Sequence, residues 1–355
     1  MDSLKLDKLR FWHRWQEAIT PTRRLLLVGV LLLLLAVVVV TRQTSVLLAP
    51  VNPAAGEPVV VNIPPQASTV KIGQMLYEQG LIRNTTFFYI YTKYRKVDYR
   101  LQAGEYTLSP QMSLPQIVDK LVRGEVRTYS FTIPEGYTIK QIADLLAQKG
   151  FVDREKFLAA TKDSYDFDFL DGVSPGENQL EGFLFPSTYQ ITRGTSEREI
   201  VRMMLKRFDQ VATPELRAQA RERNLSVREW VTLASLIEKE AKVSEERPII
   251  AGVLYNRLRL GMPLQVDATI LYALGEHRER VLYRDLEVDS SYNTYRHTGL
   301  PPGPIASPGE DSLKAALNPT NHNYLYYVSR NDGTHEFTTS LAEHNVARQR
   351  YGYYP

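Results

Sequence analysis

The sequence contains no cysteine, and this absence excludes several kinds of chemistry at once. Without cysteine there is no disulfide framework, no zinc site built on thiolates and no nucleophilic thiol. Net charge is also small, because 43 lysine and arginine residues against 40 aspartate and glutamate residues leave only +3. That balance lacks the broad basic surface of nucleic-acid binders, so nucleic acid is not an expected partner.

Familiar catalytic motifs are missing as well. The chain has no GxSxG, HExxH or P-loop pattern, so serine hydrolase, zinc protease and nucleotide hydrolase interpretations lose their usual support. The six histidines are scattered, without the spacing of metal ligands. We therefore expect neither a metal nor an organic cofactor, and the remaining chemistry is that of carboxyl groups.

One long hydrophobic run lies near the N-terminus. Residues 25–40 read LLLVGVLLLLLAVVVV, and with Thr41 they approach the roughly 17–25 residues of a membrane-spanning helix. Basic residues precede the run, so residues 1–24 are expected to stay in the cytoplasm. A cleaved signal peptide is the alternative, but no small-residue cleavage site follows Val40. We expect a single-pass helix at 25–41 in a bacterial inner membrane, with the rest of the chain in the periplasm.

The exported part has the composition of folded α+β domains. Residues 42–58 are rich in proline, alanine and small polar residues, which is typical of a linker. After them a proline turn, an N-cap residue and a short amphipathic helix recur three times, with Ser68, Ser113 and Thr138 as the caps. The copies are unevenly spaced, which favours small α+β modules over a solenoid. At roughly 150 residues per domain, 355 residues accommodate two domains.

One of these modules has a recognisable pattern. Residues 103–126, AGEYTLSPQMSLPQIVDKLVRGEV, resemble the LysM-like module that binds glycans containing N-acetylglucosamine. The resemblance implies a LysM-like region at 59–128. A small α+β module without a ligand explains the segment equally well. Five tyrosines offer faces on which a sugar could stack, although they are also ordinary strand residues: Tyr89, Tyr91, Tyr94, Tyr99 and Tyr106.

The clearest helix signal is the capping box SVRE at 226–229. It predicts a helix from Val227 to about Lys242. At about 100° per residue, the apolar residues of this helix form one broad arc. Glu238 and Glu240 fall inside that arc.

Acids on a buried arc need a physical reason. Burial keeps a carboxyl protonated near neutral pH, as a general acid acting on a glycosidic oxygen requires. Alternatively, each glutamate pairs with an arginine such as Arg247 or Arg257, or caps a neighbouring loop. The helical pattern alone leaves both interpretations open.

Four stretches carry a more specific pattern than any single motif. In chain order they are EGFLFPSTYQI from Glu181, SLIEKEAKVSEERPIIAGVLYNRLRLGMPLQVDATILYALG from Ser235, SSYNTYRHTGLPPGPIASPGEDSLKAALNP from Ser290 and YLYYVSRNDGTHEFTTSLAEHN from Tyr324. Together they resemble the endolytic murein transglycosylase, or YceG-like, family. The resemblance spans the exported chain and implies a catalytic region at 129–355.

The resemblance also implies an activity. Members cleave the β-1,4 bond between N-acetylmuramic acid and N-acetylglucosamine within peptidoglycan strands, without water, and form 1,6-anhydro ends. One glutamic acid acts first as acid and then as base, and it falls on Glu240, with Glu238 as the alternative or as a supporting residue. The implied role is to set strand length beside peptidoglycan synthases, the penicillin-binding proteins.

Two regions supply further candidates, each with a structural alternative. Gln265 and Asp267 could contact sugar hydroxyls or orient Glu240, or Asp267 could cap a helix that starts at Ala268. Loop residues further along could stack on and hydrogen-bond an N-acetyl sugar, or simply form a packed loop: Tyr292, Asn293 and Tyr295.

Glu181 is either a second acid or a loop anchor. As a second acid, Glu181 or Asp267 would activate water, which would make the protein a hydrolase of the same bond. A third possibility is a glycan-binding anchor for synthases without catalysis. This last hypothesis predicts that Glu240→Gln leaves function intact.

Overall fold

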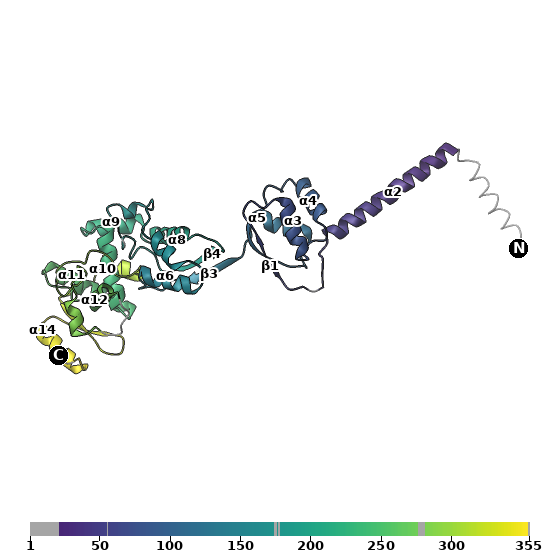
Figure 1. Ribbon diagram of the computed structural model, residues 1–355. Coiled ribbons are helices and arrows are strands. Elements are labelled where there is room, and N and C mark those ends of the chain that lie inside the picture. Colours follow the sequence, from purple (N-terminus) through teal and green to yellow (C-terminus); the bar gives the residue numbers. More distant parts are fainter. Residues whose placement is uncertain (1–20, 55, 174–175, 177, 276–280, 354–355) are drawn as a thin grey trace, which may run out of the picture. The chain divides into compact units, whose positions relative to one another are not determined.

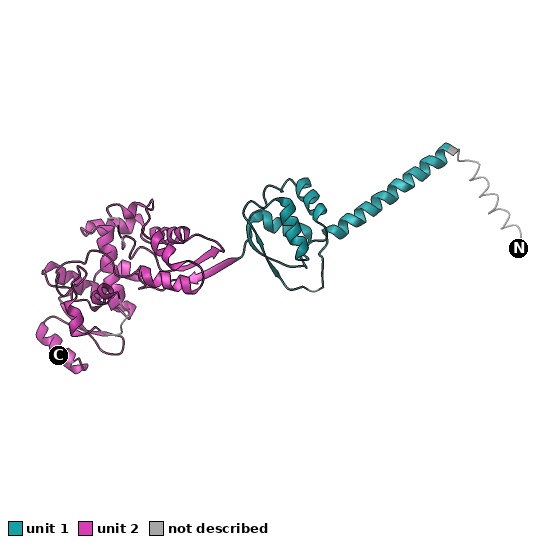
Figure 2. Ribbon diagram, in the orientation of Figure 1, with its two compact units in different colours: residues 1–127 teal, residues 128–355 magenta. Residues whose placement is uncertain are grey.

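The computed structural model describes residues 21–54, 56–173, 176, 178–275 and 281–353. Helices and strands are mixed, as the sequence predicts, and within the described residues the strands form three two-stranded antiparallel sheets. The chain divides into two compact units, residues 1–127 and 128–355 (Figure 2). This division falls one residue before the boundary expected from the sequence.

The N-terminal unit begins with α2, a helix over Pro21–Leu48 (Figure 1). Its residues 22–48 are long and apolar enough to cross a membrane, which is consistent with an anchor. The helix continues past the expected end at Thr41 because neither glycine nor proline occurs between Thr41 and Pro50. The linker prediction for 42–58 is therefore wrong for its first seven residues. Most of the basic segment 1–24 lies outside the described residues.

Among its described residues, three further helices and an antiparallel pair of strands complete this unit. Strand β1 pairs antiparallel with β2, and Val61 lies opposite Tyr106. Ser68 and Ser113 cap α3 and α5 as predicted, since their hydroxyls accept from backbone amides of the first turn. Tyr106 is buried, so it is a core residue of this unit. The elements are β1 (Val59–Ile63), α3 (Thr69–Glu78), α4 (Thr85–Tyr94), β2 (Gly104–Leu108) and α5 (Leu114–Arg123).

The C-terminal unit contains most of the helices. Strand β3 pairs with β4, and β5 pairs with β6, each antiparallel. Thr138 caps α6 with a reciprocal capping box, as predicted. The elements are β3 (Thr128–Thr132), α6 (Ile139–Gln148), α7 (Arg154–Ala160), η1 (Asp168–Leu170), β4 (Thr188–Thr192), α8 (Glu197–Val211), α9 (Pro214–Glu222), α10 (Val227–Glu240), η2 (Ser244–Glu246), α11 (Arg247–Arg259), α12 (Asp267–Leu274), η3 (Tyr283–Glu287), α13 (Glu310–Leu317), β5 (Tyr326–Ser329), β6 (His335–Thr338) and α14 (Leu341–Arg350).

Helix α10 is the central helix of this unit and packs against α9, α11, α12 and α13. Residues 230–237 are all buried, so the helix is surrounded by protein until its last turn. The indole N–H of Trp230 donates to the carbonyl of Leu313 at 2.8 Å and joins α10 to α13. The helix ends at Glu240, two residues before the predicted end, because Ala241 adopts an extended backbone conformation.

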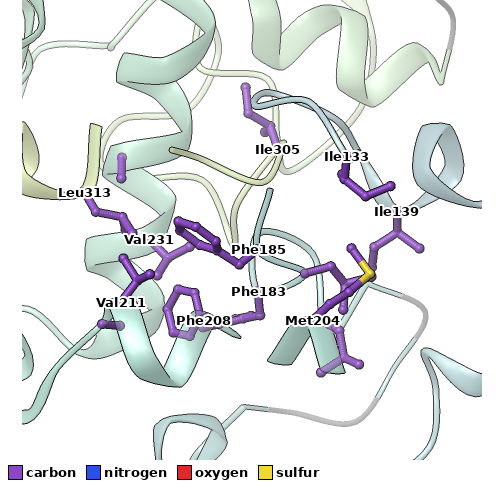
Figure 3. Close-up of a cluster of buried hydrophobic side chains, with 14 of the residues drawn as sticks. Ile133, Ile139, Phe183, Phe185, Met204, Phe208, Val211, Val231, Ile305 and Leu313 are labelled. Atoms are coloured by element: carbon purple, nitrogen blue, oxygen red, sulfur yellow. The ribbon is translucent and has the colours of Figure 1, made fainter. Parts of the chain in front are cut away.

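The EGFLFP turn fills the core beside α10. Phe183 packs edge-on against Phe208 of α8, with ring centroids 5.1 Å apart (Figure 3). Phe185 and Val231 of α10 belong to the same buried cluster. Glu181 lies two residues before Phe183, so this packing also fixes its position.

Gly182 is expected to be indispensable for that turn. Its φ is +84°, and an added Cβ would lie 2.5 Å from Cβ of Pro304 and 2.9 Å from Cγ1 of Val231. We expect Gly182→Ala to lower the free energy of unfolding by backbone strain of about 1–2 kcal/mol and overpacking of about 1–3 kcal/mol. Gly194 has the same φ, but a Cβ added there would have no neighbouring atom within 4 Å. Gly194→Ala should show the strain alone, and equal losses measured by urea unfolding would contradict the packing argument.

Candidate functional site

The last turn of α10 carries the E-K-E triplet at 238–240 that the sequence singled out. Glu240 is the final residue of the helix, and it is partly exposed. Lys239 is exposed, and its ammonium donates to the carbonyl of Gly136 at 3.4 Å. The two glutamates on either side of it have separate surroundings.

Burial dominates the environment of the Glu240 carboxyl and raises its pKa to about 7. The hydrogen bond from Tyr327 opposes this rise, the charge of Asp267 adds to it, and the charge of Arg257 lowers the pKa. A position at the C-terminus of a helix also disfavours a negative charge. Near neutral pH the protonated and ionised forms of Glu240 are therefore both populated.

Tyr327 of β5 is the direct partner of Glu240. Its hydroxyl donates to Oε2 of Glu240 at 2.9 Å, and its ring meets His335 of β6 edge-on at 5.4 Å between centroids. His335 is buried, and its Nδ1 shares a hydrogen bond of 2.6 Å with Oε2 of Glu246. The backbone N–H of His335 donates to Oε1 of the same glutamate at 2.8 Å. These contacts fix the β5–β6 hairpin, and Tyr327 with it, against η2.

Asp267 and Tyr295 form a pair beside Glu240. Asp267 does not cap a helix that starts at Ala268, because α12 begins at Asp267 and its N-cap residue, Val266, makes no side-chain capping bond. Instead, the hydroxyl of Tyr295 donates to Oδ1 of Asp267. Burial and the Asp267 carboxylate both raise the pKa of Tyr295, so this hydroxyl stays protonated.

Gln265 joins the same group through Arg257, which is buried on α11. The guanidinium of Arg257 donates to Oε1 of Gln265 at 3.3 Å and to the carbonyl of Leu264 at 2.8 Å. Its Nε donates to the carbonyl of Leu325 at 2.6 Å, just before β5. Arg257 thus ties two segments, residues 264–265 and the residue before β5, to α11 through carbonyl and amide oxygens.

Thr294 holds the two loops of the site together. Its carbonyl accepts from the N–H of Gln265 at 3.0 Å, and its hydroxyl accepts from the N–H of Val266 at 3.0 Å. The same hydroxyl shares a hydrogen bond of 2.9 Å with Thr269 of α12. This anchoring places the neighbouring Tyr295 on the Asp267 side of the loop.

The other two candidates of this loop have different roles. Asn293 is buried, its amide donates to the carbonyls of Leu286 and Val288, and its side-chain oxygen accepts from the N–H of Tyr295. For Asn293 these contacts favour the packed-loop interpretation over sugar binding. Tyr292 is partly exposed and lies against Tyr272 of α12, with centroids 4.9 Å apart.

Glu181 belongs to a second group, on the Tyr272 side. It is buried, Oε1 accepts from the N–H of Ile139 at 3.0 Å, and Oε2 accepts from the hydroxyl of Tyr272 at 3.3 Å. Burial raises the pKa of Glu181 to about 7, and these hydrogen bonds lower it. The contacts are those of a loop anchor that ties the EGFLFP turn to α6 and α12.

Glu238 is engaged by α13 rather than by Tyr327. Its Oε2 accepts from the N–H of Gly309 at 3.0 Å and from the hydroxyl of Ser312 at 2.7 Å. Gly309 is the N-cap residue of α13, where a carboxylate is favourable. Arg247 lies 3.6 Å from Oε1, so Glu238 fits the ion-pair alternative of the sequence analysis.

Glu238→Gln is therefore expected to destabilise the fold. The amide keeps one acceptor but loses the charge that serves α13 and Arg247, so the free energy of unfolding should fall by about 1–3 kcal/mol. The control is Glu245→Gln, at an exposed position, which should change it by less than about 0.5 kcal/mol. Urea unfolding measures both, and an unchanged stability of Glu238→Gln would refute the capping role.

The structure gathers Glu240, Gln265, Asp267 and Tyr295 in one group and places the other candidates around it. Tyr327, Tyr272 and Thr294 were not predicted, because in a sequence such as YLYY at 324–327 no signal tells which ring faces the carboxyl.

Among the described residues, no group of three or more histidine, aspartate or glutamate side chains is placed to hold a metal ion.

Fold and site together define a protein of mixed helices and strands in which a glutamate with a raised pKa ends a buried helix. A model of the YceG-like family matches residues 61–350. The chain belongs to the YceG-like family.

Named relatives agree with this membership. The chain is 37% identical over 318 residues to the endolytic murein transglycosylase of Bacillus subtilis strain 168, covering 86% of this chain and 88% of the relative. It is 34% identical over 310 residues to the endolytic murein transglycosylase of Streptococcus pneumoniae D39. That alignment covers 79% of this chain and 56% of the relative. A crystal structure of a putative YceG-like protein from Listeria monocytogenes is similar with a TM-score of 0.55 and 38% identity, covering 82% of this chain and 98% of that one.

Proposed function

We propose that the chain is an endolytic lytic transglycosylase that cleaves the β-1,4 bond between N-acetylmuramic acid and N-acetylglucosamine within peptidoglycan strands. Glu240 is the acid and the base of this reaction. The observation that carries the proposal is the buried carboxyl of Glu240, a partly exposed residue at the end of α10, with a pKa of about 7 beside the Tyr327 hydroxyl, in a member of the YceG-like family. Such a carboxyl exchanges its proton readily near neutral pH.

In the first step Glu240 is protonated. Tyr327 occupies Oε2, so Oε1 is the oxygen free to carry the proton to the glycosidic oxygen. The bond between C1 of N-acetylmuramic acid and that oxygen breaks, and the released N-acetylglucosamine keeps the proton as a hydroxyl. The Tyr327 hydrogen bond and the charge of Arg257 stabilise the carboxylate that remains.

In the second step the carboxylate accepts a proton from the C6 hydroxyl of the same muramoyl residue. That oxygen attacks C1 and closes the 1,6-anhydro ring, so no water is consumed and Glu240 regains its proton. The nucleophile belongs to the substrate, and its proximity replaces a second carboxylate. This sequence differs from glycosidases that use two acids.

The remaining site residues divide by their positions. Asp267, Tyr295 and Gln265, gathered beside Glu240, are assigned to sugar contacts and to the orientation of Glu240. Tyr292 offers a partly exposed ring at the other end of the same loop. Positioning roles are assigned to the three residues whose polar groups serve the fold: Glu238, Asn293 and Glu181.

The proposed place of action rests on α2 as a membrane anchor. The proposed topology has the N-terminus in the cytoplasm, α2 across the inner membrane and both units in the periplasm, where new glycan strands emerge. Cleavage within such strands ends their elongation, and peptidoglycan synthases are the proposed partners. The apolar character of residues 22–48 and the basic residues before them support this arrangement.

A hydrolase of the same bond is the second candidate function. Asp267 favours it, because its carboxylate is close enough to Glu240 to raise the pKa of that residue. In a hydrolase, Asp267 would activate a water molecule instead of leaving the C6 hydroxyl to react. The hydrogen bond from Tyr295 to Asp267 supports an orienting role instead.

The endolytic part of the proposal is tested by the lengths of early products. Isolated glycan strands of defined length are incubated with the full chain, and the products are separated by size before a tenth of the substrate has reacted. We expect fragments of intermediate length from the start. Release of disaccharides alone would contradict internal cleavage, and intact strands that are bound but never cut would favour the non-catalytic anchor.

A further inference from the structure

The segment that follows α2 is bound to the first unit. The guanidinium of Arg83 donates to the carbonyls of Pro50 and Val51 at 2.7 Å and 3.0 Å. The N–H of Asn52 donates to the carbonyl of Pro110 at 3.0 Å. Residues 50–52 of the predicted linker are therefore hydrogen-bonded to the unit, and they tie it to the end of α2.

The length of α2 sets the distance from the membrane. From Thr41, the end of the apolar run, to Leu48 the helix rises by about 10 Å at 1.5 Å per residue. The headgroup layer of one leaflet is about 5–8 Å thick. Leu48 itself packs against the core of the first unit. If α2 spans the bilayer as proposed above, this unit lies directly on the headgroup layer.

Helix α4 begins at this junction and leaves a large apolar face uncovered. Arg83, which binds the segment after α2, immediately precedes the N-cap residue Asn84 of α4. Tyr89, Ile90 and Tyr94 are 40%, 55% and 84% exposed. In Figure 1, α4 lies in the part of the first unit next to the end of α2.

The charge around α4 suits an anionic surface. Residues 83–100 contain five basic residues and one acid, Asp98. Lys93 lies on the exposed face between Tyr89 and Tyr94, with its ammonium 5.8 Å from the ring centroid of Tyr89 and 2.5 Å from Oδ2 of Asp98. Arg95 pairs with Asp119 at 2.9 Å, so the exposed Lys96 and Arg100 carry the excess positive charge of this segment. Tyrosines at headgroup level and lysines that extend toward lipid phosphates are typical of membrane interfaces.

We propose that the exposed face of α4, formed by Tyr89, Ile90, Lys93 and Tyr94, lies in the headgroup layer of the bilayer that α2 spans. This inference rests on the proposed anchor and adds a second membrane contact, which orients the first unit on the bilayer. An aliphatic residue at the centre of the face and the adjacent juxtamembrane segment favour lipid over a glycan strand as the occupant.

Single-cysteine labelling tests the proposal, because the natural chain has no cysteine. The full chain carries a fluorophore at one of three exposed positions: Ile90→Cys on α4, Val38→Cys on α2 and Val346→Cys on α14. Each protein is placed in nanodiscs of phosphatidylglycerol and phosphatidylethanolamine, with or without lipids brominated near the headgroup. Bromine quenches only a fluorophore that it touches.

We expect quenching at Val38 and at Ile90 and none at Val346, with weaker quenching at Ile90 when phosphatidylcholine replaces the anionic lipid. Quenching at Val38 without quenching at Ile90 would overturn the α4 proposal and leave the anchor intact. No quenching at Val38 would overturn both. A response of the Ile90 label to soluble glycan strands, without quenching by lipid, would assign this face to glycan instead.

Discussion

Glu240→Gln is expected to lower the rate of glycan cleavage by about 10³-fold, the size of effect that a general acid and base supplies. Glutamine has nearly the same shape, and its carbonyl can still accept the hydrogen bond that Tyr327 donates to Glu240. What it lacks is the transferable proton. Binding of glycan strands and the free energy of unfolding should therefore stay close to those of the natural chain.

The matched control lies two residues away on the same helix. Glu238→Gln should lose stability but retain cleavage at a temperature where it is folded, because its carboxylate serves Gly309 and Ser312. Initial rates on isolated strands compare both variants with the natural chain. If Glu238→Gln were inactive while folded and Glu240→Gln were active, the roles of the two glutamates would have to be exchanged.

Tyr327→Phe is expected to slow cleavage by about 10- to 100-fold, which is the value of a hydrogen bond to a charged group. The hydroxyl stabilises the Glu240 carboxylate that forms when the proton is transferred. Because this hydrogen bond lowers the pKa of Glu240, its loss should raise that pKa further above its ordinary value.

The pH profile distinguishes this role from a merely structural one. Cleavage begins with protonated Glu240, so kcat/KM should fall as pH rises through about 7 in the natural chain. In Tyr327→Phe that decline should move to higher pH while the maximum rate is lower. The adjacent Tyr326→Phe is the control, since the Tyr326 ring lies under Arg257 and away from the hydroxyl contact with Glu240. A decline at unchanged pH in Tyr327→Phe would refute the proposed hydrogen bond.

Local sequence patterns predicted which helices exist better than they predicted the residues at which those helices end. The caps Ser68, Ser113 and Thr138 were predictable because an N-cap depends on residues within one turn of it. The helix over Pro21–Leu48 exceeded its prediction because an apolar run marks the part with the composition of a membrane span and not the end of the hydrogen-bonded helix. The linker prediction also missed the contacts of Pro50 and Val51, because their partner, Arg83, lies more than thirty residues away in the sequence.

Long-range partners limited the prediction of the site in the same way. Spacing along α10 placed Glu238 and Glu240 on one apolar arc. Yet the carboxyl of Glu238 accepts from Gly309, the N-cap residue of α13, and that of Glu240 accepts from Tyr327 of β5. The periodicity of α10 does not indicate which distant element contacts each carboxyl. Family resemblance chose Glu240, and its contacts and pKa of about 7 supply the physical argument for that choice.

The central claim is that the C6 hydroxyl of the substrate, and not water, attacks C1. The most direct test is mass spectrometry of new glycan ends formed by the full chain in water enriched in heavy oxygen. The account predicts internal fragments that end in 1,6-anhydro-muramic acid, lighter by one water and free of heavy oxygen, and their absence with Glu240→Gln. Reducing muramic ends that contain heavy oxygen would contradict it and would identify a hydrolase.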